Sequence, residues 1–337
     1  MTAAPRLSVV AATRNDQHGG NQIARTQLFI DGLAEQALRF QLPVELLLVE
    51  WNPPADKPSL ADALQWPRSE WFAPRIVVVS PDLHSKFDHS DGLPLFQMIA
   101  KNAGIRRAAA EFVLATNIDI LLSDELFASF ANELKPDALY RVDRLDIEAD
   151  LDRTPLPSPA ECRALPWIRA HRSDGAHYPD GRREPWYAQA RSRLNRTVWN
   201  MSHGGALPDL FTWGCGDFTL TTKEVWEGMH GYPEWTMYSF HLDSLALVMA
   251  CAAGVEMITL APPKVAYHLE HGAGSGWTPE GARKLFGRLE AAGVPYLSGS
   301  DYDRTAREIL GKGRGFHPLS GPEWGLGSAD LPIISPS

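Results

Sequence analysis

The sequence predicts an α/β fold built on a mostly parallel sheet with helices on its faces. Short apolar runs typical of buried strands alternate with amphipathic runs of helical period through the first third of the chain. Because strands that alternate with helices pair in parallel through crossover connections, this order favours a parallel sheet. The 337 residues, 44% of them hydrophobic, are enough for one large domain or two modest ones.

Four apolar runs define the first part of the expected sheet. The predicted strands cover residues 7–12, 44–49, 75–79 and 112–115. Amphipathic spacing predicts helices over residues 21–42 and 95–110. Prolines close the second and third strands, at Pro53 and Pro81. In a parallel sheet of this kind, ligands bind beyond the carboxyl ends of the strands.

The middle of the chain has a different character. Residues 137–203 are rich in proline, arginine and tryptophan and show weak periodicity, so we expect an irregular insertion or lid within a single domain. The elements expected after it are strands over 211–221 and 255–260 and helices over 223–229 and 242–254. The tail after residue 291 is rich in glycine, proline and serine, and we expect it to be loosely ordered from residue 311 onward.

Charge and cysteine content exclude several function classes. The formal net charge is −9, whereas a nucleic-acid surface is normally basic and clustered, so no nucleic-acid partner is expected. The three cysteines, Cys162, Cys215 and Cys251, are widely spaced and form no CxxC pair. This pattern argues against a structural zinc site and a disulfide framework, and it fits a reducing compartment.

The chain carries no apolar run of the roughly 18 residues that a bilayer-spanning helix requires. The first six residues also lack the basic and apolar regions of a leader peptide. We therefore expect a soluble, cytoplasmic protein. Peripheral contact with a membrane and the oligomeric state stay open at the level of sequence.

Several common catalytic motifs are missing. The turn after the first predicted strand, residues 13–20, is neither a GxGxxG loop nor a GxxxxGK[ST] loop. This disfavours a dinucleotide dehydrogenase and a P-loop NTPase. The sequence also contains no GxSxG elbow and no HExxH, which disfavours an α/β-hydrolase and a helix-borne zinc protease.

Polar clusters instead follow three of the predicted strands. They are residues 14–16 (Arg-Asn-Asp), 50–52 (Glu-Trp-Asn) and 117–119 (Asn-Ile-Asp). Each cluster alone also suits an ordinary polar turn, but parallel strands would bring all three to one edge of the sheet. The first two would hydrogen-bond a base and a ribose. Asp119, a carboxylate at the end of a buried strand, needs a cation or strong donors beside it and would hold a metal against a diphosphate.

The ordered set of motifs resembles the GT-A glycosyltransferases, and most closely their family 2. The matching segments are residues 12–15, 49–52, 101–108, 117–119, 216–226, 231–234 and 241–247. The resemblance extends over about residues 7 to 270. It implies the GT-A, or nucleotide-diphospho-sugar transferase, fold: a Rossmann-like mixed sheet flanked by helices, in a single domain with an acceptor-side insertion. On this basis the chain divides into a nucleotide-sugar-binding half (1–136), the insertion (137–203), an acceptor-binding half (204–290) and a tail (291–337).

The resemblance implies transfer of a sugar from a nucleoside diphosphate sugar to a saccharide or other hydroxyl acceptor. Nucleotide contacts are expected from Thr13, Asn15, Glu50, Asn102 and Asn117. Asp119, with Asn117 and His268, would hold a divalent cation, and His271 is the second histidine candidate. A histidine beside carboxylate oxygens suits Mn²⁺ somewhat better than Mg²⁺.

The sequence departs from the family pattern at two places. The family's DxD motif is represented by Asn117-Ile118-Asp119, and an amide oxygen ligates a hard cation with less charge than a carboxylate. The family's Glu-Asp pair is represented by Leu242-Asp243, which leaves Asp243 as the expected general base. Asp243 reads equally well as the N-cap of a helix over 244–254. Asp217, which follows a glycine-rich turn, is the rival base or a ligand of the acceptor hydroxyl.

Three other functions remain open from the sequence. A sugar nucleotidyltransferase of the same fold would carry a glycine-rich loop after the first strand, and Gly19-Gly20 is a poor match to it. A catalytically inactive nucleotide- or sugar-binding module is supported by Asn117 in place of an aspartate. A zinc hydrolase would draw on His177, His203, His241, His268 and His271, whose spacing matches no helix-borne zinc motif.

Overall fold

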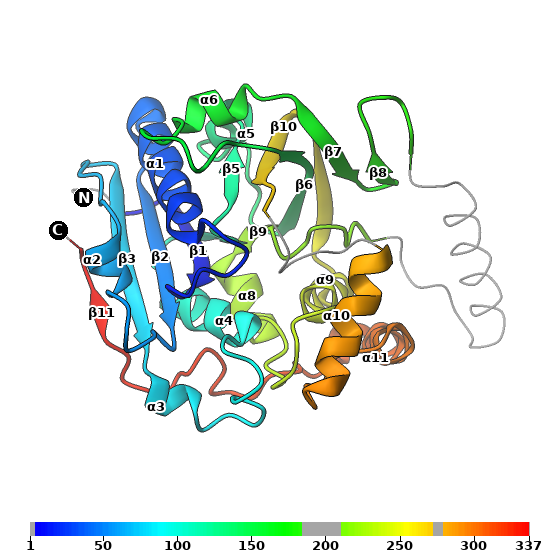
Figure 1. Cartoon of the computed structure of the whole chain (residues 1–337). Helices are drawn as coiled ribbons and strands as arrows, with labels where there is room; N and C mark the ends of the chain where they lie inside the picture. Colours follow the sequence, from blue (N-terminus) through cyan, green and yellow to red (C-terminus); the bar gives the residue numbers. More distant parts are fainter. Residues whose placement is uncertain (1–3, 184–209, 272–278, 337) are drawn as a thin grey trace.

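The computed structural model describes residues 4–183, 210–271 and 279–336, and its strands form one mixed sheet (Figure 1). The order across the sheet is β11-β3-β2-β1-β4-β9-β6-β10-β5, with β7 and β8 extending it beside β6. The strands in its first half are β1 (Leu7–Thr13), β2 (Val44–Trp51), β3 (Phe72–Val79), β4 (Phe112–Thr116) and β11 (Ile333–Ile334). Those in its second half are β5 (Ile120–Leu122), β6 (Ala138–Ile147), β7 (Trp167–Arg172), β8 (Gly175–His177), β9 (Phe218–Thr222) and β10 (Glu256–Leu269).

Strands β1 to β4 form the parallel half that the sequence predicts. β1 pairs in parallel with both β2 and β4, and β2 pairs in parallel with β3. The register places Thr13 opposite Glu50, so the ends of neighbouring strands meet at one edge. Every residue of β1 and β2 is buried, as expected for strands that helices cover on both faces. The second half is mixed, because β9 runs antiparallel to β4 and β6 while β10 runs parallel to β6.

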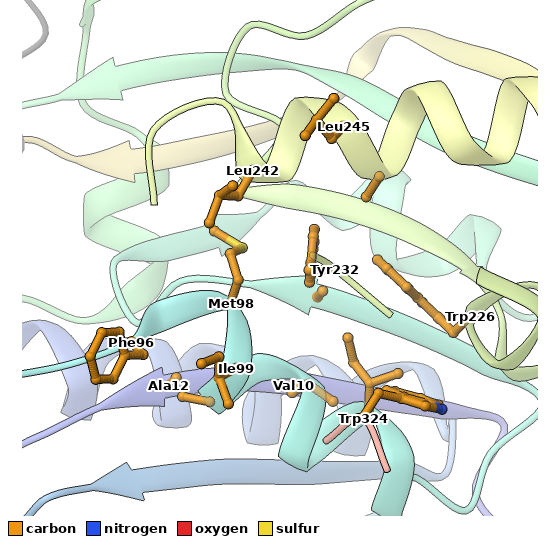
Figure 2. Packing of buried hydrophobic residues seen from close by; sticks show 14 of the residues in the cluster. Val10, Ala12, Phe96, Met98, Ile99, Trp226, Tyr232, Leu242, Leu245 and Trp324 are labelled. Atoms are coloured by element: carbon orange, nitrogen blue, oxygen red, sulfur yellow. The ribbon is translucent and has the colours of Figure 1, made fainter. Parts of the chain in front are cut away.

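Helices cover both faces of the sheet, and the side chains of β1 alternate between them. Leu7, Val9 and Ala11 pack in the cluster of α1 (Gln22–Phe40), whereas Val10 and Ala12 pack in the cluster of α4 (Gln97–Arg107). Figure 2 shows Val10 and Ala12 beside Ile99 of α4, near Trp226, Tyr232 and Leu242. The remaining helices are α2 (Leu60–Ala63), α3 (Pro81–His84), α5 (Asp124–Ser129), α6 (Pro159–Arg163), α8 (Lys223–Met229), α9 (Leu242–Ala253), α10 (Pro279–Ala291), α11 (Gly299–Lys312) and the 3₁₀ turn Gly313–Gly315.

The expectation of an irregular segment over 137–203 is wrong at its start. Residues 138–147 form β6, which lies between β9 and β10 in the sheet. The sequence hides this strand because Arg141, Asp143 and Asp146 break its apolar pattern, although all three are buried. Arg141 donates from Nε to the carbonyl of Phe211 and from Nη2 to that of Trp213, which satisfies part of a charged group inside the protein. The domain boundaries themselves stay a prediction.

The expectation of a loosely ordered tail after residue 311 is also wrong. Trp324 is buried against the α4 side of the core (Figure 2). Arg106 and Arg107, at the end of α4, donate to backbone carbonyls of residues 322–329 and so tie the tail to the helix. β11 then pairs with β3. Among the helices that the structure describes, none combines the length and apolar character that a membrane span requires.

Candidate functional site

The ends of β1 and β4 open into a cavity of about 280 Å³. Its lining includes Thr13 at the end of β1 and the segment from Asn117 to Asp119 that follows β4. The other lining residues are Ala12, Arg14, Asp16, His18, Gln22, Arg25, Leu93, Pro94, Leu95, Gln97, Tyr238, Ser239 and His271. The cavity therefore lies where parallel α/β sheets bind ligands, beyond the carboxyl ends of the strands.

Asp119 lies in the wall of this cavity with 6% of its surface exposed. Its Oδ2 is 3.0 Å from Arg25 Nη1 and 3.1 Å from His271 Nε2. Burial by itself would raise the pKa of this carboxyl, but His271, His268 and Arg25 outweigh burial and hold the pKa well below its usual range. Its Oδ1 is buried and accepts no hydrogen bond from the described residues. Asp119 is therefore an ionised carboxylate with one oxygen available for a further ligand.

Strand pairing explains why His268 reaches Asp119. β10 runs antiparallel to β5 and places His268 opposite Ile120, and the Leu269 N–H donates to the Asp119 carbonyl at 2.9 Å. His268 Nε2 lies 3.9 Å from Asp119 Oδ2. Its Nδ1 lies 3.2 Å from Asp146 Oδ1 on the opposite side of the ring. Burial and Arg144 would lower the pKa of His268, but the nearby carboxylates, Asp146 first, raise it overall.

Asp119, His268 and His271 form a group that fits a divalent cation. One potential ligand atom from each lies within 4.8 Å of the others. Two imidazoles and a carboxylate suit Mn²⁺ and its neighbours in the transition series better than Mg²⁺, which prefers oxygen ligands. The unsatisfied Oδ1 of Asp119 supports the same interpretation. His271, the second candidate from the sequence, lies nearer to the carboxylate than His268 does.

Arg25 is a site residue that sequence reasoning missed. It lies on α1, is 2% exposed, and donates to the carbonyls of His18 and Gly20 as well as to Asp119. Its charge neutralises the only carboxylate of the Asn117-x-Asp119 motif. The sequence offered one signal for it. Arg25 precedes Leu28 by three residues and Phe29 by four, so it lies on the same apolar face of the helix as they do.

Asn117 lines the cavity, and its side-chain amide bonds to protein groups on both sides. Its Oδ1 accepts from Gln97 Nε2 at 2.9 Å, and its Nδ2 donates to Asp217 Oδ1 at 2.6 Å. Both ends of its amide are thus engaged within the protein, and the role of Asn117 as a metal ligand stays a prediction. Asp217, at the start of β9, also pairs with Arg144. Burial would raise the pKa of Asp217, but Arg144 and then His268 lower it.

A second buried cluster, also missed by sequence reasoning, lies behind His268. Asp146 of β6 is 0% exposed and contacts Arg144, Arg169 and His171 in addition to His268. Burial would raise the pKa of Asp146, yet hydrogen bonds from the two histidines and the charge of Arg144 hold it far below the usual range. A carboxylate behind a metal-binding histidine fixes the orientation of its ring. No sequence signal marks this role, because Asp146 lies in the segment predicted to be irregular.

Asp243 lies in the first turn of α9 and not at its cap. The cap is His241, which has a φ of 66°, and Asp243 Oδ1 accepts from the Ser244 N–H at 2.8 Å. A Cβ added to Gly216 would lie 3.0 Å from Asp243 Oδ2, so the carboxylate faces the turn before β9. The buried Lys101 donates from Nζ to the Gly216 carbonyl at 2.7 Å. Asp217 and Asp243, the two predicted base candidates, thus flank one turn, although neither is among the cavity's described lining residues.

Asn15 and Glu50 support a loop beside the cavity. Asn15 Nδ2 donates to the Pro58 carbonyl at 3.0 Å, and Glu50 Oε1 accepts from the Leu60 N–H at 2.8 Å. Burial raises the pKa of Glu50. Both side chains are buried and lie outside the described lining, so in this conformation they shape the loop between β2 and α2.

Asn102 occupies a different place from the one its predicted nucleotide contact requires. It is fully buried in α4, donates to the Tyr232 carbonyl and to Glu234 Oε1, and accepts from the Tyr232 N–H at 2.8 Å. All three bonds tie α4 to the segment that follows α8. Asn102 is also absent from the described lining, so the geometry gives it a packing role.

Comparison with known proteins finds solved structures of low similarity to this chain. No protein-family model and no curated protein matches the chain. The catalytic domain of Drosophila β1,4-galactosyltransferase 7, solved with xylobiose, is 8% identical, covers 78% of this chain and 67% of its own, and gives a TM-score of 0.36. S. aureus TarS 1–349, solved with UDP, is 14% identical in sequence and gives a TM-score of 0.41. The match covers 94% of this chain and 74% of the TarS chain. These similar structures are glycosyltransferases, and the predicted class of fold, a mixed sheet flanked by helices, is confirmed by the strand order.

Proposed function

We propose that this protein transfers a sugar from a nucleoside diphosphate sugar to an acceptor hydroxyl. The observation that carries the proposal is the position of Asp119 and His271 in the wall of a cavity beyond the ends of β1 and β4, with His268 close to Asp119. A buried carboxylate beside two imidazoles at this edge of the sheet suits a cation that faces an anionic ligand. The cavity's volume of about 280 Å³ suits a small ligand held at its open end.

Asp119, His268 and His271 would hold the cation. When bound, a divalent cation would neutralise the charge that develops on the leaving diphosphate. Arg14 and Arg25 also line the cavity, so its wall contributes fixed positive groups near the same place. His18 lines it too, but burial lowers the pKa of its imidazole and favours the neutral form. Manganese is preferred over magnesium in this proposal because two of the three ligands are nitrogens.

Part of the cavity lining is apolar. Leu93, Pro94 and Leu95 line it together with the polar residues that follow β1, which suits the flat face of a nucleobase. Asn52 Nδ2 donates to the Pro94 carbonyl at 3.1 Å, and Arg14 Nε donates to the Asn52 carbonyl at 3.1 Å. These bonds connect the loop after β2 with two lining residues, Pro94 and Arg14. Thr13 would contact the nucleotide directly, whereas Asn15 and Glu50 would act by holding the loop after β2.

Asp243 is the proposed general base. In an inverting transfer the acceptor oxygen forms a bond to the anomeric carbon, the bond from that carbon to the diphosphate oxygen breaks, and the hydroxyl proton passes to a base. Asp217 is less suited to accept it, because Arg144 holds its carboxylate and lowers its pKa. Asp243 is half-buried, and its Oδ2 faces the turn at Gly216.

Calorimetry and turnover test the proposal together. UDP and GDP are titrated into the protein with and without Mn²⁺, and transfer or hydrolysis is followed with UDP- and GDP-sugars. We expect Asp119→Ala to lower metal-dependent turnover by about 10²-fold or more and to remove the effect of Mn²⁺ on nucleotide binding. Asp330→Ala, which removes an exposed carboxylate from the tail, is the matched control and should leave both unchanged. Full metal-dependent turnover in Asp119→Ala would refute the proposal.

A second function, nucleotide binding without transfer, is favoured by one specific contact. Arg25 already neutralises Asp119, so a diphosphate could be bound by fixed cationic groups with no metal. In that case UDP or GDP would bind equally well in the presence of EDTA, and no sugar nucleotide would be consumed. The same titrations therefore separate the two functions.

A further inference from the structure

A continuous chain of hydrogen bonds crosses the site through Asn117. Ser239 Oγ donates to Gln97 Oε1 at 3.1 Å, and Gln97 Nε2 donates to Asn117 Oδ1 at 2.9 Å. Asn117 Nδ2 then donates to Asp217 Oδ1 at 2.6 Å, and the other carboxylate oxygen of Asp217 pairs with Arg144. The chain connects the loop before α9 with α4, the motif after β4 and the start of β9.

The donors and acceptors of this chain fit in only one direction. Arg144 can only donate and an ionised Asp217 can only accept, so the atom of Asn117 that faces Asp217 must be its nitrogen. The oxygen of Asn117 therefore faces Gln97, which must present its own nitrogen. Gln97 Oε1 is then left to accept from Ser239. The orientation of both amides is fixed by the charge on Asp217.

We propose that Asn117 is a positioning residue for Asp217, and that an amide at position 117 and a carboxylate at position 217 require each other. With an aspartate at 117, the motif would place two carboxylate oxygens about 2.6 Å apart in a partly buried site, where Asp217 is 8% exposed. Arg144 already serves both Asp217 and Asp146, so a second negative charge would lack a partner there. Asn117 thus keeps the motif from carrying a second negative charge at this position. In its place, the amide donates a hydrogen bond to the carboxylate of Asp217, which lies directly before β9.

The same geometry favours a cation site formed by Asp119, His268 and His271. Because the oxygen of Asn117 already accepts from Gln97, a cation would have to compete with Gln97 for it. This consequence rests on the proposed function, whereas the pairing of residues 117 and 217 is a property of the protein without ligand.

Thermal unfolding of the metal-free protein tests the pairing with a double-mutant cycle. Asn117→Asp opposes two acceptors and Asp217→Asn opposes two donors, so each should lower the unfolding midpoint, by roughly 5 °C for Asn117→Asp. The double variant Asn117→Asp/Asp217→Asn restores every donor–acceptor match and should recover more than half of that loss. The matched control is Asn21→Asp, because Asn21 donates to Asp152 in the same way at 3.0 Å but in an exposed position, and it should shift the midpoint by less than about 1 °C.

Each result of the double-mutant cycle either supports or overturns the pairing of residues 117 and 217. If Asn117→Asp does not fold and the double variant does, the pairing is supported. A double variant that is no more stable than Asn117→Asp, or that also fails to fold, overturns it. Because these measurements use neither nucleotide nor metal, they decide the pairing even if the proposed transferase function is wrong.

Titration with Mn²⁺ alone tests the consequence for the cation site. We expect Asn117→Ala to change Mn²⁺ affinity by less than about threefold, whereas Asp119→Ala should weaken it by at least tenfold. A loss in Asn117→Ala equal to that in Asp119→Ala would show that Asn117 is a ligand and overturn its assignment as a positioning residue. If the wild-type protein binds no Mn²⁺, the metal-dependent function fails, and the unfolding cycle alone decides the inference.

Discussion

Arg25 Nη1 lies 3.0 Å from Asp119 Oδ2, and both side chains are buried at the edge of the cavity. The single carboxylate of the Asn117-x-Asp119 motif therefore has its charge compensated by α1 before any ligand arrives. Arg25 is further fixed by the carbonyls of His18 and Gly20. Arg25 therefore connects the loop after β1 with the proposed cation site. A substitution of Arg25 should affect both the loop and the cation site.

Replacement of Arg25 should destabilise the free protein and strengthen cation binding. Arg25→Gln leaves Asp119 as a buried carboxylate with less compensation, which should cost about 3 kcal/mol of unfolding free energy. Without the competing guanidinium charge, Mn²⁺ affinity should rise about tenfold. Unfolding measured with and without Mn²⁺ should show that the metal restores much of the lost stability.

Arg39→Gln provides the matched control for this prediction. Arg39 pairs with Asp124 from the same helix, but its side chain is 57% exposed. Its loss should change stability by less than about 1 kcal/mol and leave Mn²⁺ affinity unchanged. Weaker Mn²⁺ binding in Arg25→Gln would contradict the competition between Arg25 and the metal.

Replacement of Asp146 should weaken cation binding, although Asp146 is not one of the three proposed ligands. Asp146→Asn weakens the contacts to Arg144, Arg169 and His268, and we expect a loss of about 3–5 kcal/mol of stability. Because Asp146 orients the ring of His268, Mn²⁺ affinity measured on the folded fraction should fall by about 10-fold to 100-fold. An affinity equal to that of the wild type would show that His268 is oriented by other contacts or is not a ligand.

Two glycines near α8 should respond in opposite directions to alanine. At Gly231, φ is +68° and an added Cβ would lie 2.2 Å from Asn102 Oδ1, so Gly231→Ala should lower stability by about 2–4 kcal/mol. At Gly228, inside α8, nothing lies within 4 Å of an added Cβ. Gly228→Ala should therefore be neutral or stabilise by up to about 1 kcal/mol. Chemical denaturation of the two variants measures the difference, and equal effects would contradict the packing role of Asn102.

Lys101 should make stability depend on alkaline pH. Burial lowers the pKa of its ammonium to about 8, below the usual value of 10.5. Between these two values the unfolded chain holds a proton that the native protein has released, so unfolding free energy should rise with pH from about 8 to 10.5, by roughly 2–3 kcal/mol. Lys101→Met should remove this rise relative to the wild type. Lys57→Met, at an exposed lysine, should keep it, and a rise that persists in Lys101→Met would assign it to other groups.

The sequence predicted the parallel half of the sheet and the order of its first strands and helices. These elements are readable because β1, β2 and β4 are buried on both faces, and uninterrupted apolar runs report that burial locally. The sequence also predicted that Asp119 would lie beyond the end of β4, with a histidine from residues 268–271 near it. The structure places both histidines near Asp119, because β10 pairs antiparallel with β5, and their role as metal ligands stays a prediction.

The tertiary structure alone decided how the charges of the site are balanced. Arg25, Arg144 and Asp146 look like breaks in an apolar pattern when read along the chain, yet each pairs with a partner far away in sequence, and Arg25 and Asp146 are buried. For the same reason the sequence pattern did not predict β6 as a strand. Local periodicity records which side chains avoid water, but a buried charge is tolerated only through its partner, and that partner is chosen by the pairing of strands and helices in three dimensions.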